Sequence, residues 1–216
     1  MLIKAWRHKN NIPSIELLTL KTKQYINNKD WYKNSNKLIK KRFKEYNLFI
    51  DILSITSPRT SVKRNCTNAI ETYNQVLNNQ KLTVQYGLTH ANTKRNIDLM
   101  LKSNKFKGQK VNSFSNALKL KDNNNIVIDT WMLKAFNLKR ESPLKNDIEH
   151  INTTVKTIAK KLNLKPYEVQ ACLWVYAKSE LNNTTVKESY DFSYYLKAYF
   201  DQTKLNIGGT YEKSYR

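Results

Sequence analysis

The stretch Lys105-Phe106-Lys107-Gly108-Gln109-Lys110, followed by Ile126-Val127-Ile128-Asp129-Thr130-Trp131, decides how this chain folds. Apolar residues before and after the first stretch recur at helical spacing, so the sequence predicts a helix, a tight hairpin and a second helix. A short loop then leads to Asp129, which opens a third helix. Gly108 is one of only four glycines. A glycine at such a turn can adopt a positive φ and bring the backbone close to a phosphate.

Lys110 and Asp129 are the candidate chemical pair, because each stands at the start of one of two successive predicted helices. Each has a simpler explanation when taken alone. Lys110 can be one more surface lysine of a basic chain. Asp129 can be an ordinary N-cap, since aspartate is a preferred residue there.

The rest of the chain predicts an all-α fold with scarce strand signal. Pro58 interrupts the apolar helix that ends near Ser54, and Thr60 or Ser61 can cap the next helix. Asn92-Thr93 resembles a further N-cap, and residues 139–143 resemble a linker. We expect one unit with two packed lobes: residues 48–136 as the hairpin lobe, residues 1–47 with 144–205 as the second, and 206–216 as a loose tail.

The charge of the chain indicates a polyanionic partner. Lysine and arginine number 38 against 17 acidic residues, which gives a formal net charge of +21. Nucleic acid is the commonest partner of so basic a protein. Compositional drift in an AT-rich genome would also raise lysine together with asparagine and isoleucine. A basic face on residues 31–46 is either simply solvated or in contact with a nucleic-acid backbone.

The two cysteines, Cys66 and Cys172, are too few for a four-cysteine cluster and are expected to be buried free thiols. The three histidines show no metal-site spacing, so the sequence predicts no metal and no cofactor. It also shows no secretory signal and no apolar run of the roughly twenty residues that a membrane helix needs. We therefore expect an intracellular protein, cytoplasmic or nucleoid-associated.

Three segments together resemble the helix–hairpin–helix superfamily of DNA glycosylases, typified by endonuclease III. The run Leu53–Asn65 resembles the segment that follows a buried helix and enters the minor groove. The hairpin with Gly108 and Lys110 resembles the family's helix–hairpin–helix, and Val127–Met132 resembles its Val-Asp-Thr-His segment. The order and spacing of the three agree over about residues 48–136.

The chain departs from the family pattern at several positions. Phe106 stands where the family's Leu-Pro-Gly-Val-Gly hairpin has its first glycine, and Trp131 replaces or adjoins the usual histidine. The cysteines of the iron–sulfur cluster are absent, as in several branches of the superfamily.

The resemblance implies a role for each candidate residue. Lys110 would attack the sugar C1′ to form a Schiff base, and Asp129 would activate the attacking group and offset positive charge on the sugar. A phosphate would be held by Lys105, Lys107, Gly108 and Gln109. The gap left by the flipped base would be filled by Ser57, Pro58 and Arg59, and the pocket would be lined by Trp131 and Trp174.

The sequence therefore predicts a monomeric DNA glycosylase, with or without AP lyase activity, that extrudes a damaged or modified base from double-stranded DNA. Two alternatives stay open. One is a base-flipping enzyme on the same scaffold that modifies a base, as in viral hypermodification of thymine. The other is a non-catalytic helix–hairpin–helix protein that only grips the DNA backbone. The sequence does not indicate which base is recognised.

Overall fold

The computed structural model describes residues 11–122, 124–181 and 190–206, and in these ranges the chain is all helical. The prediction of an all-α chain is confirmed. Of the expected tail at 206–216, residues 207–216 lie outside the described residues. The elements are α2 (Ile15–Gln24), η1 (Ile26–Asn28), α3 (Trp31–Arg42), α4 (Tyr46–Ile55), α5 (Val62–Leu77), η2 (Gly87–Thr89), α6 (His90–Ser103), α7 (Gln109–Lys119), α8 (Thr130–Ala135), α9 (Lys145–Leu162), α10 (Pro166–Glu180) and α11 (Phe192–Asn206).

Local sequence signals set most helix boundaries. Ser61 caps α5 by accepting a hydrogen bond from the Arg64 N–H, and Asp129 caps α8 in the same way with two N–H groups. Pro166 occupies the first turn of α10, where its missing N–H costs nothing. The cap expected at Asn92-Thr93 is wrong, because α6 already begins at His90, directly after the 3₁₀ turn η2.

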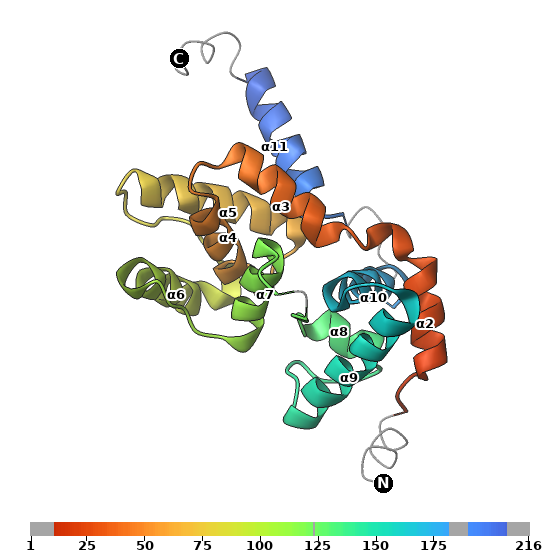
Figure 1. Ribbon diagram of the computed structural model, residues 1–216. Coiled ribbons are helices and arrows are strands. Elements are labelled where there is room, and N and C mark those ends of the chain that lie inside the picture. The colour runs from red at the N-terminus through yellow and green to blue at the C-terminus, as the bar shows by residue number, and fades with distance from the viewer. Residues whose placement is uncertain (1–10, 123, 182–189, 207–216) are drawn as a thin grey trace.

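The helices form two groups, each around its own apolar core (Figure 1). The first core is built mainly from α3 to α7 and α11, and the second from α2, α8, α9 and α10. This grouping differs from the expected lobes: α8 packs with the second group, whereas α3 and α11 pack with the first. The contacts between helices explain this grouping, because α8 packs against α10 whereas α11 packs against α3 and α5.

Helix α10 contributes to both cores. Tyr167, Ala171 and Val175 belong to the first core, and Leu173 and Ala177 belong to the second. A helix that is apolar all round is buried on all sides. This explains why residues 166–178 show no single apolar stripe. The helix is therefore the element that joins the two groups and fixes the space between them.

The hairpin between α6 and α7 is fixed by two asparagine side chains. The Asn96 amide donates to the Lys107 carbonyl and accepts from the Lys107 N–H, at 3.2 and 2.9 Å. The Asn112 amide donates to the carbonyls of Phe106 and Gly108. Gly108 has φ +110°, a conformation that L-residues with a Cβ rarely adopt. The expected positive-φ glycine turn is present, and it sets the start of α7.

The two cysteines are buried free thiols, as predicted. Burial raises the pKa of both thiols, that of Cys172 to about 12, and nearby carboxylates add to the effect. A thiol with a raised pKa is a poor nucleophile near neutral pH. Cys66 and Cys172 therefore pack in the interior.

Candidate functional site

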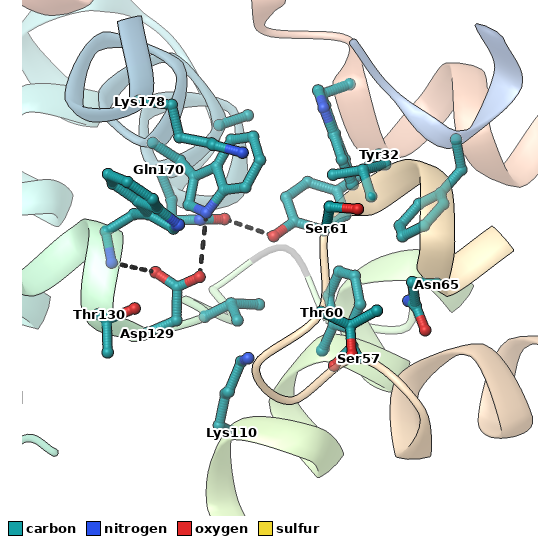
Figure 2. Close-up of a pocket in the computed structure, with 18 of the residues that line it drawn as sticks. Tyr32, Ser57, Thr60, Ser61, Asn65, Lys110, Asp129, Thr130, Gln170 and Lys178 are labelled. Carbon is teal, nitrogen blue, oxygen red and sulfur yellow. Dashed lines mark hydrogen bonds between the residues drawn. The ribbon is translucent and has the colours of Figure 1, made fainter. Parts of the chain in front are cut away.

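A cavity of about 330 Å³ lies between the two helix groups (Figure 2). Its volume is at the lower end of the range of about 300–1,000 Å³ that small-molecule pockets occupy. Aromatic rings make up much of its wall, and polar side chains reach it from both groups. The lining residues are Trp31, Tyr32, Ser57, Arg59, Thr60, Ser61, Val62, Asn65, Lys110, Phe114, Val127, Asp129, Thr130, Trp131, Gln170, Ala171, Trp174, Lys178 and Phe192.

The cavity brings Lys110 and Asp129 together. On α7, Lys110 and Phe114 are one helical turn apart and both line the cavity, because residues four apart share a helix face. On the segment that leads to α8, Val127 and Asp129 line the cavity while Ile126 and Ile128 face away from it. Alternation of this kind is typical of extended chain.

Three hydrogen bonds fix the Asp129 carboxylate. Its Oδ1 accepts from the N–H groups of Trp131 and Met132, each at 3.0 Å. Its Oδ2 accepts from the indole Nε1 of Trp174, also at 3.0 Å. The two hydrogen bonds from backbone N–H groups are those of an ordinary N-cap, but an N-cap does not require the hydrogen bond from Trp174. The side chain is therefore held in one orientation at the cavity wall.

Lys110 reaches into the cavity from the first turn of α7 (Figure 2). The side chain is partly buried, and its amine makes no hydrogen bond or ion pair within the described part of the chain. An amine that is not committed to a carboxylate can act on a ligand. The predicted placement of Lys110 opposite Asp129, in one cleft between two helical groups, agrees with the geometry.

Both predicted pocket tryptophans line the cavity, and a lysine lies between them. The Lys178 amine is 5.3 Å from the Trp131 ring centroid and 5.2 Å from that of Trp174, within the range of cation–π attraction. Lys178 is only 7% exposed. In Figure 2 it enters from the side of the cavity opposite Lys110. Lys178 is not among the residues predicted from the sequence.

A buried phenol and a buried amide form the inner wall. The Tyr32 hydroxyl donates to Gln170 Oε1 at 2.7 Å, and both residues line the cavity (Figure 2). Burial raises the pKa of Tyr32 above its ordinary value, and the negative charge of Asp129 raises it further. The phenol therefore stays protonated and can keep donating to the amide.

The loop before α5 forms the rim of the cavity. Ser57 and Arg59 line it, whereas Pro58, the third predicted wedge residue, is not among the lining residues. Arg59 adopts a left-handed φ of +55° and pairs with Glu141 at 2.9 Å across the two groups. Both side chains are largely exposed, so the pair contributes little stability. Ser57 and Arg59 thus bring this loop to the cavity wall.

A second cavity, of about 370 Å³, lies on the other side of the segment before α8. Lys110 is common to both linings. The second lining is mostly polar and includes Gln109 and Ser113 from α7 and Asn152 and Lys156 from α9. Of the predicted phosphate-holding residues, Gln109 thus lines a cavity, while the side chains of Lys105 and Lys107 are exposed on the hairpin.

Gln170 and Lys178, which sequence reasoning missed, share a signal with the predicted Trp174. The three residues follow one another at intervals of four along α10, so they lie on one helix face. Polar and charged residues at that spacing within an otherwise apolar helix indicate a face turned toward something polar. Tyr32 carried no such signal, because a tyrosine in an apolar stripe is usually part of the core.

A family model described as a family of unknown function, DUF7178, matches residues 18–181. The chain belongs to this family. The matched span includes every residue that lines the first cavity except Phe192. No curated protein and no solved structure matches the chain significantly. Among the described residues, no helix has the length and apolar character to cross a membrane.

Proposed function

We propose that this protein is a DNA glycosylase that receives a base extruded from duplex DNA in the cavity between its helix groups. The observation that carries the proposal is the shared cavity of Lys110 and Asp129. The Lys110 amine, which has no partner among the described residues, and the fixed carboxylate of Asp129 lie on two walls of one aromatic cavity. An enzyme that cuts the bond between a sugar and its base needs a nucleophile and a negative charge near the sugar.

The chemistry follows from the two side chains. The Lys110 amine, once deprotonated, forms a bond to C1′, and the bond from C1′ to the base breaks. The base leaves with the electron pair and is protonated. Opening of the sugar ring then gives an imine between Lys110 and C1′, from which the strand can be nicked. Asp129, held by Trp174 and two backbone N–H groups, offsets the positive charge that develops on the sugar.

The net charge of +21 supports binding to the DNA backbone. The backbone N–H groups at the start of α7 would bind a phosphate next to the second cavity, where Lys156 adds charge. Ser57 and Arg59, which line the cavity, would fill the gap left by the extruded base. Binding of this kind weakens as the salt concentration rises.

Borohydride trapping tests the proposal. The protein is mixed with a duplex that contains one abasic site, and sodium borohydride reduces any imine to a stable amine. We expect a covalent protein–DNA adduct with the wild-type protein and none with Lys110→Gln. Equal binding of both proteins to the duplex serves as the control for folding. Absence of an adduct with the wild-type protein, despite binding, would contradict a Schiff-base mechanism.

A base-flipping enzyme that modifies the base is the second candidate, because the same cavity would hold the base. Such an enzyme would bind the duplex but yield neither an adduct nor an abasic product. A non-catalytic backbone-binding protein would in addition be insensitive to Asp129→Asn in every assay. The trapping experiment and a mass measurement of the recovered DNA separate the three.

A further inference from the structure

We infer that Tyr32 and Gln170 bind the polar edge of the extruded base, and that this pair takes either of two kinds of edge. The inference rests on the proposed function and names its substrate class. One kind of edge, that of uracil derivatives, has a ring N–H beside a carbonyl oxygen. The other, that of cytosine derivatives, has a ring nitrogen that accepts a hydrogen bond beside an amino group that donates one.

The pair lies at the buried wall of the first cavity. Tyr32 and Gln170 both line the cavity (Figure 2), and their exposed fractions are only 3% and 2%. The Tyr32 hydroxyl donates to Gln170 Oε1 at 2.7 Å. Among the described residues, Gln170 Nε2 makes no hydrogen bond, yet it is not one of the fully enclosed atoms that lack a partner. Nε2 therefore keeps donors for a ligand in the cavity.

The hydroxyl of Tyr32 is the only hydrogen-bond partner of the Gln170 amide in the described part of the chain. In the observed arrangement the pair offers the cavity a donor, Gln170 Nε2, and an acceptor, the Tyr32 oxygen, which keeps a lone pair. Half a turn of the amide exchanges Nε2 and Oε1, which have nearly the same size. Nε2 then donates to the Tyr32 oxygen, and the pair offers an acceptor, Oε1, and a donor, the Tyr32 O–H.

The two arrangements match the two kinds of edge. In the first, Nε2 donates to the carbonyl oxygen of a uracil derivative, and the Tyr32 oxygen accepts from its ring N–H. In the second, Oε1 accepts from the amino group of a cytosine derivative, and the Tyr32 hydroxyl donates to its ring nitrogen. Each arrangement contains one hydrogen bond between Tyr32 and Gln170, so their exchange costs little free energy.

The second arrangement requires a phenol that keeps its proton. Burial raises the pKa of Tyr32, and the negative charge of Asp129 raises it further, so the hydroxyl is protonated near neutral pH. A pair fixed in one arrangement would reject one kind of edge. Two donors, or two acceptors, would then face each other in a buried site and stay unpaired, which is costly.

Gln170→Met tests the inference on two bases that differ in this edge. Duplexes carry a single 5-hydroxyuracil or 5-hydroxycytosine, and base release is followed by mass spectrometry. Each base is compared with itself in the two proteins, so the different leaving abilities of the two bases cancel. We expect the variant to release both bases about tenfold more slowly than the wild-type protein, because each base loses a buried hydrogen-bond partner. Trapping on abasic DNA, which holds no base, should keep the wild-type rate.

Tyr32→Phe keeps the aromatic ring and should slow the release of both bases in the same way. Gln24→Met is the matched control, because Gln24 is exposed on α2 and lines neither cavity. Its loss should leave base release unchanged.

Slower release of only one base from Gln170→Met would show a pair fixed in one arrangement and would overturn the inference. Wild-type release of both bases by that variant, or equal slowing of release and trapping, would also overturn it. So would a wild-type protein that traps abasic DNA but releases neither base. Failure of the wild-type protein to trap abasic DNA would instead contradict the proposed function.

Discussion

The two cavities on either side of Lys110 have nearly the same volume, about 330 and 370 Å³, but very different linings. Aromatic rings line much of the first cavity, and the Asp129 carboxylate at its wall accepts three hydrogen bonds. Besides Lys110, the second is lined by side-chain amides, a serine, the carboxylate of Asp122, exposed Lys156 and four apolar residues. Volume alone therefore does not identify the reactive site. The difference lies in the aromatic lining of the first cavity and in the fixed orientation of Asp129 at its wall.

The local backbone produces this difference. Successive residues of 126–129 face opposite cavities, and on α7 Lys110 and Phe114 face one cavity while Gln109 and Ser113 face the other. A single helix start and a single extended segment thus separate an aromatic-lined cavity from a mostly polar one. We expect the reaction to take place in the first cavity and the DNA backbone to bind at the second. The following variants test this expectation.

The largest expected effect is that of Asp129→Asn on the first cavity. Asparagine is also a good N-cap, so the variant should fold, whereas loss of the charge should slow adduct formation by about a hundredfold or more. The rate of trapping and a thermal melt measure the two effects separately. Asp129→Ser keeps a cap but removes the second oxygen. If that variant retains full activity, Asp129 is only a cap.

Trp174→Phe should have the next largest effect. It removes the hydrogen bond from Nε1 to Asp129 Oδ2 but keeps an aromatic ring in the wall. We expect single-turnover trapping to slow by about tenfold, the value of one hydrogen bond to a charged group. Trp131→Phe is the comparison, because that indole lines the same cavity without bonding to Asp129. Equal losses in both variants would show that only packing matters.

Lys156→Met tests the second cavity. Removal of one phosphate contact should weaken duplex binding a few-fold and lower the slope of log K against log[salt] by about one. The rate of trapping at saturating protein should stay unchanged. Fluorescence anisotropy at several salt concentrations measures the slope, and Lys81→Met, an exposed lysine outside both cavities, is the charge-matched control. If Lys156→Met abolishes trapping at saturating protein, the chemistry takes place in the second cavity and not in the first.

Gly108→Ala should have the smallest effect on chemistry and a visible effect on stability. A Cβ at φ +110° is strained and costs about 1–3 kcal/mol. For a chain of this size, each kcal/mol lowers Tm by about 2–4 °C. Gly87 has φ +62° and open space around it, so Gly87→Ala is strained through its backbone alone and serves as the comparison at a second positive-φ glycine. A Gly108→Ala protein as stable as the wild-type protein would remove the conformational requirement at the hairpin.

Local patterns in the sequence were sufficient to predict the helices, the glycine turn, the cap at Asp129 and the burial of both cysteines. Each depends on a few neighbouring residues, whose spacing or side-chain chemistry is visible in the chain. The pairing of Lys110 with Asp129 came instead from the resemblance. The separation of Lys110 and Asp129 along the chain does not by itself show that the starts of their two helices face one another.

The cavity wall was predicted only in part, because α10 packs between two cores. Its residues are apolar on nearly every side, so Gln170 and Lys178 escaped prediction, although their spacing of four with the predicted Trp174 marks one helix face. The division into lobes failed to anticipate α8 for a related reason. A helix of six residues such as α8 is buried only by packing against other helices, and its partner α10 lies some thirty positions further along the chain.

The most direct test of the central claim is to identify the lysine that reacts. Wild-type protein is trapped with borohydride on an abasic duplex, digested, and the DNA-modified peptide is located by mass spectrometry. The shared cavity of Lys110 and Asp129 predicts a single modification at Lys110, which Asp129→Asn strongly reduces. A modification at Lys178, the other amine of the cavity, or no modification of bound protein would contradict the assignment of Lys110 as the nucleophile.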